Sequence, residues 1–164
     1  MKKIFFPIAV ITLFFVVVAP GSCKNEEKAA MERKKDIEMV TASIHGVIGW
    51  AAEKDFGLLY SIIANDSNYL EVGPSEGLIH GFDEFKRCEA FWGSADFKAI
   101  SYEIRDLTVS LSKGGDTAWF YCILDDINEW KGLPACWINA RWTGVLEKRD
   151  GRWVIVQQHF SLPA

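Results

Sequence analysis

The dipeptide Asp150-Gly151, with a long β-rich run on each side, constrains the fold more than any other part of the chain. Both residues suit the positive φ values of a two-residue hairpin turn. The flanking runs place polar or amphipathic residues among apolar ones: Arg141 and Trp142 before the turn, Gln157 and His159 after it. Strands of this mixed character are typical of a pocket wall. The sequence therefore predicts a closing β-hairpin that lines a pocket.

The chain before this hairpin changes from helical to strand periodicity. Apolar residues recur every three or four positions over 37–51, and shorter stretches of the same kind cover 54–64 and 82–92. A short strand is expected over 69–72. From residue 100 the period is two, and its change of parity near Arg105-Asp106 predicts a β-bulge. Helices followed by strands predict an α+β fold, with a curved antiparallel sheet wrapped around the N-terminal helices.

The first 22 residues have the composition of a secretory signal peptide. A basic start, Met1-Lys2-Lys3, precedes an apolar run over 4–18 and then small residues. The apolar run is shorter than the about 20 residues that a membrane-spanning helix needs. We therefore divide the chain into a signal peptide (1–22), a tether (23–33) and one folded domain (34–164).

The residues at the end of this signal suggest a lipid anchor. Gly21-Ser22-Cys23 resembles the lipobox of bacterial lipoproteins, although Pro20 stands where that motif usually has Leu. The resemblance implies lipidation of Cys23. With Lys24 next, it implies an outer-membrane-anchored, periplasmic or cell-surface lipoprotein. The alternative is an ordinary cleaved signal that releases a free protein.

Charge and cysteine content restrict the partners of the domain. Lys2 and Lys3 are the only charged residues of the signal, so 16 basic and 22 acidic residues remain, a net charge of −6. This balance argues against nucleic acid, whose phosphates need clustered Lys and Arg. The sequence has no CxxC pair or Cys/His cluster, so we expect no metal site and no cofactor. Export permits a disulfide between Cys122 and Cys136, and buried free thiols are the alternative.

Three motifs together point to a known family. They are Gly115-Asp116-Thr117-Ala118-Trp119, the run Arg141-Trp142-Thr143-x-Val145-Leu146, and Asp150-Gly151-x-Trp153-x-Ile155-x-x-x-His159-Phe160-Ser161. In this order they resemble the SnoaL-like branch of the nuclear transport factor 2-like superfamily, over residues 34–161. The resemblance implies a cone-shaped sheet around helices, a cavity in the cone, and homodimers formed through the sheet. Because this fold hosts isomerases, dehydratases, assembly hubs and ligand binders, it selects no reaction.

Pairing the two strands directly about the turn predicts which side chains enter the cone. Trp142 then faces His159, and Gly144 faces Gln157, all on the face that we assign to the cavity. The opposite face is assigned to the outside and carries Trp137, Asn139, Arg141, Thr143, Val145, Val156, Gln158 and Phe160. A bulge in either strand would reverse part of this assignment. No Asp or Glu occurs on the inferred inward face, although Asp66 or Glu71 could reach in from elsewhere.

His159 is the first candidate for a functional residue, because imidazole titrates near neutral pH. It would be a hydrogen-bonding or acid/base group at the cavity mouth, or else a structural histidine at the end of the sheet. Gln157 and Trp142 would contact the polar end of a ligand. Aromatic residues that suit either pocket walls or plain core complete the set: Trp50, Tyr60, Trp92 and Trp119.

These features support three hypotheses. The first is an exported, lipid-anchored binding domain whose cone takes a small, largely apolar ligand with one polar end. The second is an isomerase or hydro-lyase that uses His159 as its general base. The third is a structural or assembly dimer without a working cavity. A carboxylate in the cone within reach of His159 would favour the enzyme, and a filled cone would favour the third hypothesis.

Overall fold

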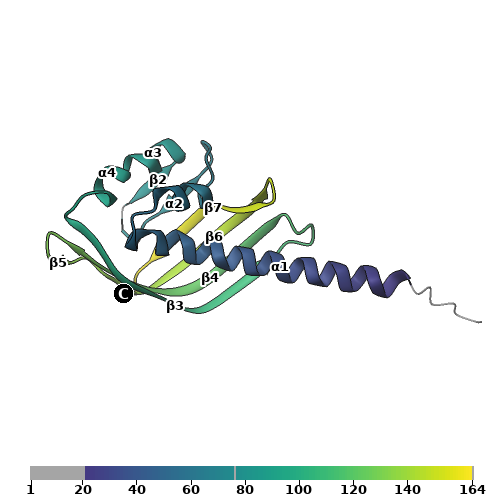
Figure 1. Cartoon of the computed structure of the whole chain (residues 1–164). Helices are drawn as coiled ribbons and strands as arrows, with labels where there is room; N and C mark the ends of the chain where they lie inside the picture. The colour runs from purple at the N-terminus through teal and green to yellow at the C-terminus, as the bar shows by residue number, and fades with distance from the viewer. Residues whose placement is uncertain (1–20, 76, 164) are drawn as a thin grey trace, which may run out of the picture.

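The computed structural model describes residues 21–75 and 77–163 and shows an α+β fold, as the sequence predicts. Helices come first and the long strands afterwards (Figure 1). The elements in chain order are α1 (Gly21–Gly49), η1 (Trp50–Ala52), α2 (Phe56–Ile62), β1 (Leu70–Val72), β2 (Leu78–His80), α3 (Phe82–Arg87), α4 (Glu89–Trp92), β3 (Phe97–Leu111), β4 (Thr117–Trp130), β5 (Leu133–Pro134), β6 (Trp137–Arg149) and β7 (Arg152–Ser161).

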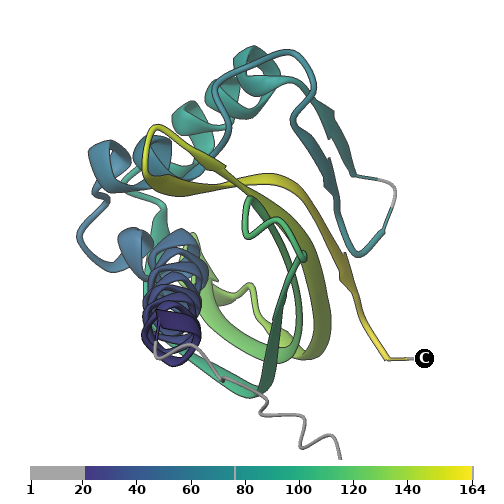
Figure 2. The ribbon, with the colours of Figure 1, turned by 90° about the vertical axis from the view of Figure 1, so that its right-hand side faces the viewer.

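The strands form a single sheet in the order β2-β1-β7-β6-β4-β3, with β5 paired to the end of β4. The long strands are antiparallel to one another, and β1 joins the edge of β7 in parallel. Figure 2 looks along α1 and shows these strands curling around the space beside that helix. The sheet is therefore the curved wall of a cone, and the helices cover its open side.

The apolar stripe of α1 fills one side of the cone. Val40, Ile44, Val47 and Trp50 recur at helical spacing and are buried, as an amphipathic helix on a sheet requires. They join a core that the sheet completes with large side chains such as Trp142. The predicted helix over 37–51 is confirmed.

A buried carboxylate fixes α1 to the closing hairpin. Asp36 Oδ1 accepts hydrogen bonds from Lys148 Nζ at 2.6 Å and from Trp153 Nε1 at 3.1 Å. Burial alone would raise the pKa of Asp36, but these two hydrogen bonds outweigh it and lower the pKa. The helix is thus tied at this point to the two strands that follow it by more than a hundred residues.

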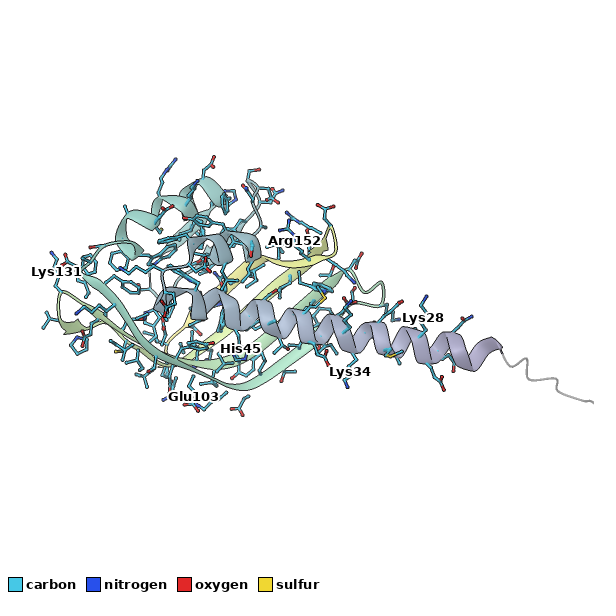
Figure 3. The ribbon with its side chains drawn as sticks, in the orientation of Figure 1. Lys28, Lys34, His45, Glu103, Lys131 and Arg152 are labelled. Atoms are coloured by element: carbon cyan, nitrogen blue, oxygen red, sulfur yellow. The ribbon has the colours of Figure 1, made fainter. Side chains whose placement is uncertain are left out.

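The part of α1 before Arg33 extends beyond the body of the domain, and Arg33 itself still donates hydrogen bonds to the backbone oxygens of Leu111 and Ser112. Figure 3 shows Lys28 on this extension, clear of the sheet. The expected tether over 23–33 is therefore a continuation of the helix. Residues 1–20, which make up most of the predicted signal peptide, lie outside the described residues. Within the described part of the chain, no helix is both long enough and apolar enough to span a bilayer.

Several of the expected elements have different bounds. The helix expected over 82–92 is divided at Cys88 into α3 and α4, and the strand period expected from residue 100 begins at Phe97 in β3. The sequence reading missed β2, whose three residues show no clear alternation. Cys122 and Cys136 are free thiols, and burial raises the pKa of Cys122 to about 12.

Bulges interrupt three of the four long strands. The one predicted near Arg105-Asp106 is confirmed: the β3–β4 register shifts between Arg105 and Thr108, and Asp106 has a φ of 53°. The same pair of strands has another register shift between Ala99 and Ser101. In β6, Asn139 has a φ of 55° and the register to β4 shifts.

Strand β7 also contains a bulge. Leu146 pairs with Ile155, as predicted, but Val145 pairs with Gln157, so Val156 is an extra residue.

The extra residue makes the predicted pairing wrong beyond Ile155. Trp142 pairs with Phe160 and Thr143 with His159, because one inserted residue moves all later side chains to the other face. Gln158 and Phe160 therefore enter the cone, and Gln157 and His159 leave it. The bulge in β6 likewise turns Trp137 inward. The inward assignment of Trp142, Gly144 and Leu146 is correct, since all three are buried.

Candidate functional site

A cavity of about 100 Å³ remains in the cone between the helices and the wide end of the sheet. Its walls come from the helices α1, η1, α2, α3 and α4 and from the strands β1, β3, β4, β6 and β7. The lining residues are Val47, Ile48, Trp50, Ala51, Leu59, Glu71, Phe85, Trp92, Phe97, Asp126, Asn128, Trp137, Gln158 and Phe160. Most are apolar, and six are aromatic.

The aromatic rings form two opposed groups. On the helical side, Trp92 contacts Trp50 at 5.6 Å and Phe85 at 5.1 Å between ring centroids. On the sheet side, Phe160 contacts Trp137 at 5.0 Å. Such tilted and edge-to-face pairs fix the rings in place, so the cavity has preformed flat walls.

A hydrogen-bonded network supports one polar corner of the cavity. Gln158 is 3 % exposed; its Oε1 accepts from Trp142 Nε1 at 3.2 Å. Its Nε2 donates to Tyr69 Oη and to Glu71 Oε2, both at 2.8 Å. Tyr69 Oη in turn donates to the same Glu71 oxygen at 2.8 Å. All polar atoms of the Gln158 amide are thus hydrogen-bonded within the protein, and one of its N–H groups orients Glu71. The other carboxyl oxygen of Glu71, Oε1, has no hydrogen bond among the described residues and remains free to accept one.

Asp126 and Asn128 form a second polar corner, on the inward face of β4. Asn128 is 7 % exposed, and its Oδ1 is the one buried side-chain N or O atom of the described residues that lacks a hydrogen-bond partner. Leaving a buried acceptor unpaired costs about 1–3 kcal/mol. Such an atom beside a cavity is therefore a candidate ligand contact.

The two carboxyl groups are both perturbed by their surroundings. Burial raises the pKa of Glu71, and the hydrogen bonds from Tyr69 and Gln158 oppose the rise without cancelling it. Burial also raises the pKa of Asp126, with a smaller opposing effect of Asn128. Carboxyl groups with raised pKa values in an apolar cavity are characteristic of binding and catalytic sites.

Two of the residues predicted to form the pocket line the cavity, Trp50 and Trp92. Trp142 is fully buried behind it and supports Gln158. Tyr60 also lies outside the lining and donates a hydrogen bond to Glu89 Oε2 at 2.6 Å.

The other predicted pocket residues lie on the outer face of the sheet. His159 is exposed, Trp119 is 50 % exposed, and Gln157 borders a shallow outer groove with Trp119. The side chain of Cys23 is outside the described side chains. In the described residues, no three His, Cys, Asp or Glu side chains meet as they would around a metal ion.

The sequence reading missed Asp126, Asn128 and Gln158. Asp125 and Asp126 are adjacent in β4, yet Asp125 pairs with Arg105 on the outside and Asp126 enters the cone. One signal was present: Gly144 stands in a strand interior, where Gly often marks a bulge or a close approach. A Cβ there would lie 2.6 Å from Phe120 Cε1. Glu71, named as a residue that could reach in, does line the cavity.

Comparison with known proteins identifies the family. The model of the SnoaL-like domain matches residues 40–164, which is most of the chain. The chain therefore belongs to the SnoaL-like family, and its fold is that of nuclear transport factor 2-like proteins. No curated protein matches the sequence.

Solved structures share the fold at low sequence identity. A protein of the nuclear transport factor 2-like family from Streptomyces avermitilis, described as a candidate dehydratase, has a TM-score of 0.68 at 21% identity, covering 80% of this chain and 98% of that one. A protein with a cystatin-like fold from Novosphingobium aromaticivorans has a TM-score of 0.64 at 14% identity, covering 84% and 88%. A protein of unknown function from Prochlorococcus sp. NATL2A has a TM-score of 0.61 at 18% identity, and the match covers 77% of this chain and 92% of that one.

The raised pKa of Asp126 gives a testable dependence of stability on pH. The unfolded chain ionises this group first, so its contribution to stability is complete below the unfolded pKa and is lost as pH rises through the folded pKa. Asp126→Asn removes this loss. We expect its melting temperature, relative to the wild type, to rise as the pH increases from about 4 toward neutral.

Thermal melts over this range measure the effect, and Glu129→Gln is the matched control. Glu129 belongs to the same strand, but alternation along β4 directs it away from the cavity. An equal change of slope in this control would show that loss of charge, and not burial, is responsible.

Proposed function

We propose that the protein is an exported, lipid-anchored domain that binds a small, largely apolar molecule with one polar end in its cone. The observation that carries this proposal is the cavity itself. Aromatic walls surround it, and Glu71, Asp126 and Asn128 converge on it. Ligand sites have this composition: mostly apolar walls with a few placed polar groups. In this proposal these three residues take the role that the sequence suggested for His159, Gln157 and Trp142.

The volume limits the size of the ligand. Typical ligand pockets measure about 300–1,000 Å³, and this cavity has about 100 Å³. A closed apolar cavity of about 150 Å³ in another protein accepts benzene. The best fit is therefore a single small ring or a short branched chain with one polar substituent. An open cavity also argues against a purely structural role for the cone.

Filling the cavity should abolish binding while the domain stays folded. Ala51 lines the cavity from η1, so Ala51→Phe places a ring in the ligand space. Trp50, Trp92 and Trp137 report occupancy, because a ligand between them changes their fluorescence. We expect titration with small aromatic alcohols to change the emission of the wild type and not that of the variant.

The neighbouring residue provides the control for this substitution. Ala52 belongs to the same short helix but is exposed and absent from the lining, so Ala52→Phe should bind like the wild type. Equal binding by both variants, with unchanged circular dichroism, would contradict the assignment of the cavity as the ligand site.

Export and anchoring are supported by the signal-like residues 1–22 and by Cys23 at their end. The helical extension of α1 provides a spacer between Cys23 and the cone (Figure 1). We expect a mature N-terminus at Cys23 carrying acyl chains, which intact-mass spectrometry of the membrane fraction would detect. Cys23→Ser should release the protein from that fraction. A mature protein with an unmodified Cys23 would remove the anchor from the proposal.

We also propose a homodimer formed through the outer face of the sheet. Trp119 and Tyr121 on β4 are 50 % and 40 % exposed, and Ile138 on β6 is 48 % exposed. Aromatic residues are enriched at protein interfaces. Trp119→Arg is expected to convert a dimer into a monomer in sedimentation equilibrium. A wild-type protein that sediments with the mass of one chain at micromolar concentration would contradict the dimer.

An isomerase or hydro-lyase remains the second candidate, with a different base. His159 lies outside the cone, whereas Glu71 and Asp126 have raised pKa values inside it. A carboxylate of raised pKa is a better general base at neutral pH than an ordinary one. Proton NMR of a candidate ligand after incubation separates the two functions, because only an enzyme rearranges or breaks bonds of the ligand, and NMR also detects an isomer of equal mass.

A further inference from the structure

The oxygens of Glu71, Asp126 and Asn128 that line the cavity are acceptors once the two carboxyl groups are ionised, and the Asn128 side chain is hydrogen-bonded to Asp126. The amide donors of Gln158 are committed to Tyr69 and Glu71. Glu71 keeps acceptor capacity at Oε1, and Asp126 presents a second carboxyl group. A ligand that matches this wall must therefore bring hydrogen-bond donors.

Asn128 provides independent support for a donor ligand. Its Oδ1 is buried and lacks a partner in the described residues. The other two buried polar side chains, Asp36 and Gln158, both have their hydrogen bonds satisfied. The unpaired acceptor thus occurs at the cavity and not elsewhere in the described core. A donor on the ligand would recover the cost of burying it.

The charges around the cavity are of one sign. Among the lining residues of the described chain there is no Lys, Arg or His, whereas two acidic residues, Glu71 and Asp126, are present. The helical and sheet walls add ring faces from Trp50, Trp92 and Trp137. The faces of aromatic rings carry negative electrostatic potential and attract cations.

From these observations we infer that the ligand is a small organic cation: a primary or secondary ammonium group on a compact apolar or aromatic skeleton. The ammonium N–H groups pair with Asn128 Oδ1 and with the carboxyl groups of Glu71 and Asp126. The skeleton lies between the aromatic walls. This inference rests on the proposed function, since it names the class of ligand for the same cavity.

Binding of a cation should be linked to proton release. The ionisable groups in or beside the cavity are Glu71, Asp126, Tyr69 and Cys88, and burial raises the pKa of each. A bound ammonium group lowers the pKa of neighbouring carboxyl groups, so a protonated carboxyl expels its proton to solvent. Affinity for the cation therefore rises with pH until the carboxyl groups are ionised. A neutral ligand releases no proton.

Three near-isosteric probes test the inference: benzylamine, benzyl alcohol and benzoate. Each is titrated calorimetrically into the purified protein near pH 7.5, where the amine is a cation. We expect the amine to bind at least about tenfold more tightly than the alcohol, a difference of roughly 1.4 kcal/mol. Benzoate should bind more weakly than either. Repeating the titration at successively lower pH should weaken the binding of the amine, because protonation of the carboxyl groups competes with the cation, and should leave the binding of the alcohol unchanged.

Variants locate the preference within the cavity. Asp126→Asn should reduce the tenfold preference for the amine to less than about threefold, because one of the two carboxyl groups is lost. Affinity for the alcohol should change little. Asn128→Leu removes the unpaired acceptor and should lower the affinity for the amine by about fivefold or more. Glu129→Gln, on the other face of β4, should retain the full preference.

The possible results separate this inference from the proposed function. If the alcohol binds as tightly as the amine, the cation inference is wrong and the binding function stands. If none of the three probes binds, both are wrong. Should Asp126→Asn fail to fold, the preference of the wild type for the amine and the Asn128→Leu variant still decide the question.

Discussion

One extra residue in β7 determines which side chains enter the cone. Val156 has no partner in the register between β6 and β7, so the strand reverses its facing after Ile155. As a result Gln158 and Phe160 point inward, and Gln157 and His159 point outward. The polar corner depends on this reversal, because Gln158 orients Glu71 and holds Tyr69 and Trp142 in the same network. With regular pairing Gln157 and His159 would face the cone in place of Gln158 and Phe160, and Glu71 would lose its hydrogen bond from Gln158.

The buried polar side chains fall into two sets: those whose hydrogen bonds are fully formed within the protein, and those that line the cavity and are only partly compensated. Asp36 is bonded by Lys148 and Trp153, and its lowered pKa favours the charged form that holds α1 to the hairpin. At the cavity the opposite holds. Glu71 and Asp126 have raised pKa values, and Asn128 has an unpaired acceptor. Burial without full compensation destabilises the fold, and a ligand could relieve that cost. The cavity therefore has the energetics of a binding site.

Much of the fold could be predicted, because it follows from local periodicity. The amphipathic stripe of α1, the turn at Asp150-Gly151 and the bulge near Asp106 are each visible within a few residues. The pocket was predicted only in part. Trp50 and Trp92 follow from the helical stripe and line the cavity, while Trp119 and His159 lie on the outside. Assigning a strand residue to one face requires the register along the whole strand, and a single insertion reverses it.

The sequence by itself determined the order of helices and strands, the family, the closing turn and the acidic balance of the domain. These depend on residue type and spacing over short stretches, which one chain displays directly. Only the tertiary structure decided that Asp126 and Gln158 face the cavity, that Glu71 joins them from β1, and that Asn128 keeps an unpaired oxygen there. The physical reason is that strand bulges and the edge pairing of β1 with β7 join residues far apart in the chain. Their positions follow from long-range backbone hydrogen bonds, which local sequence patterns do not encode.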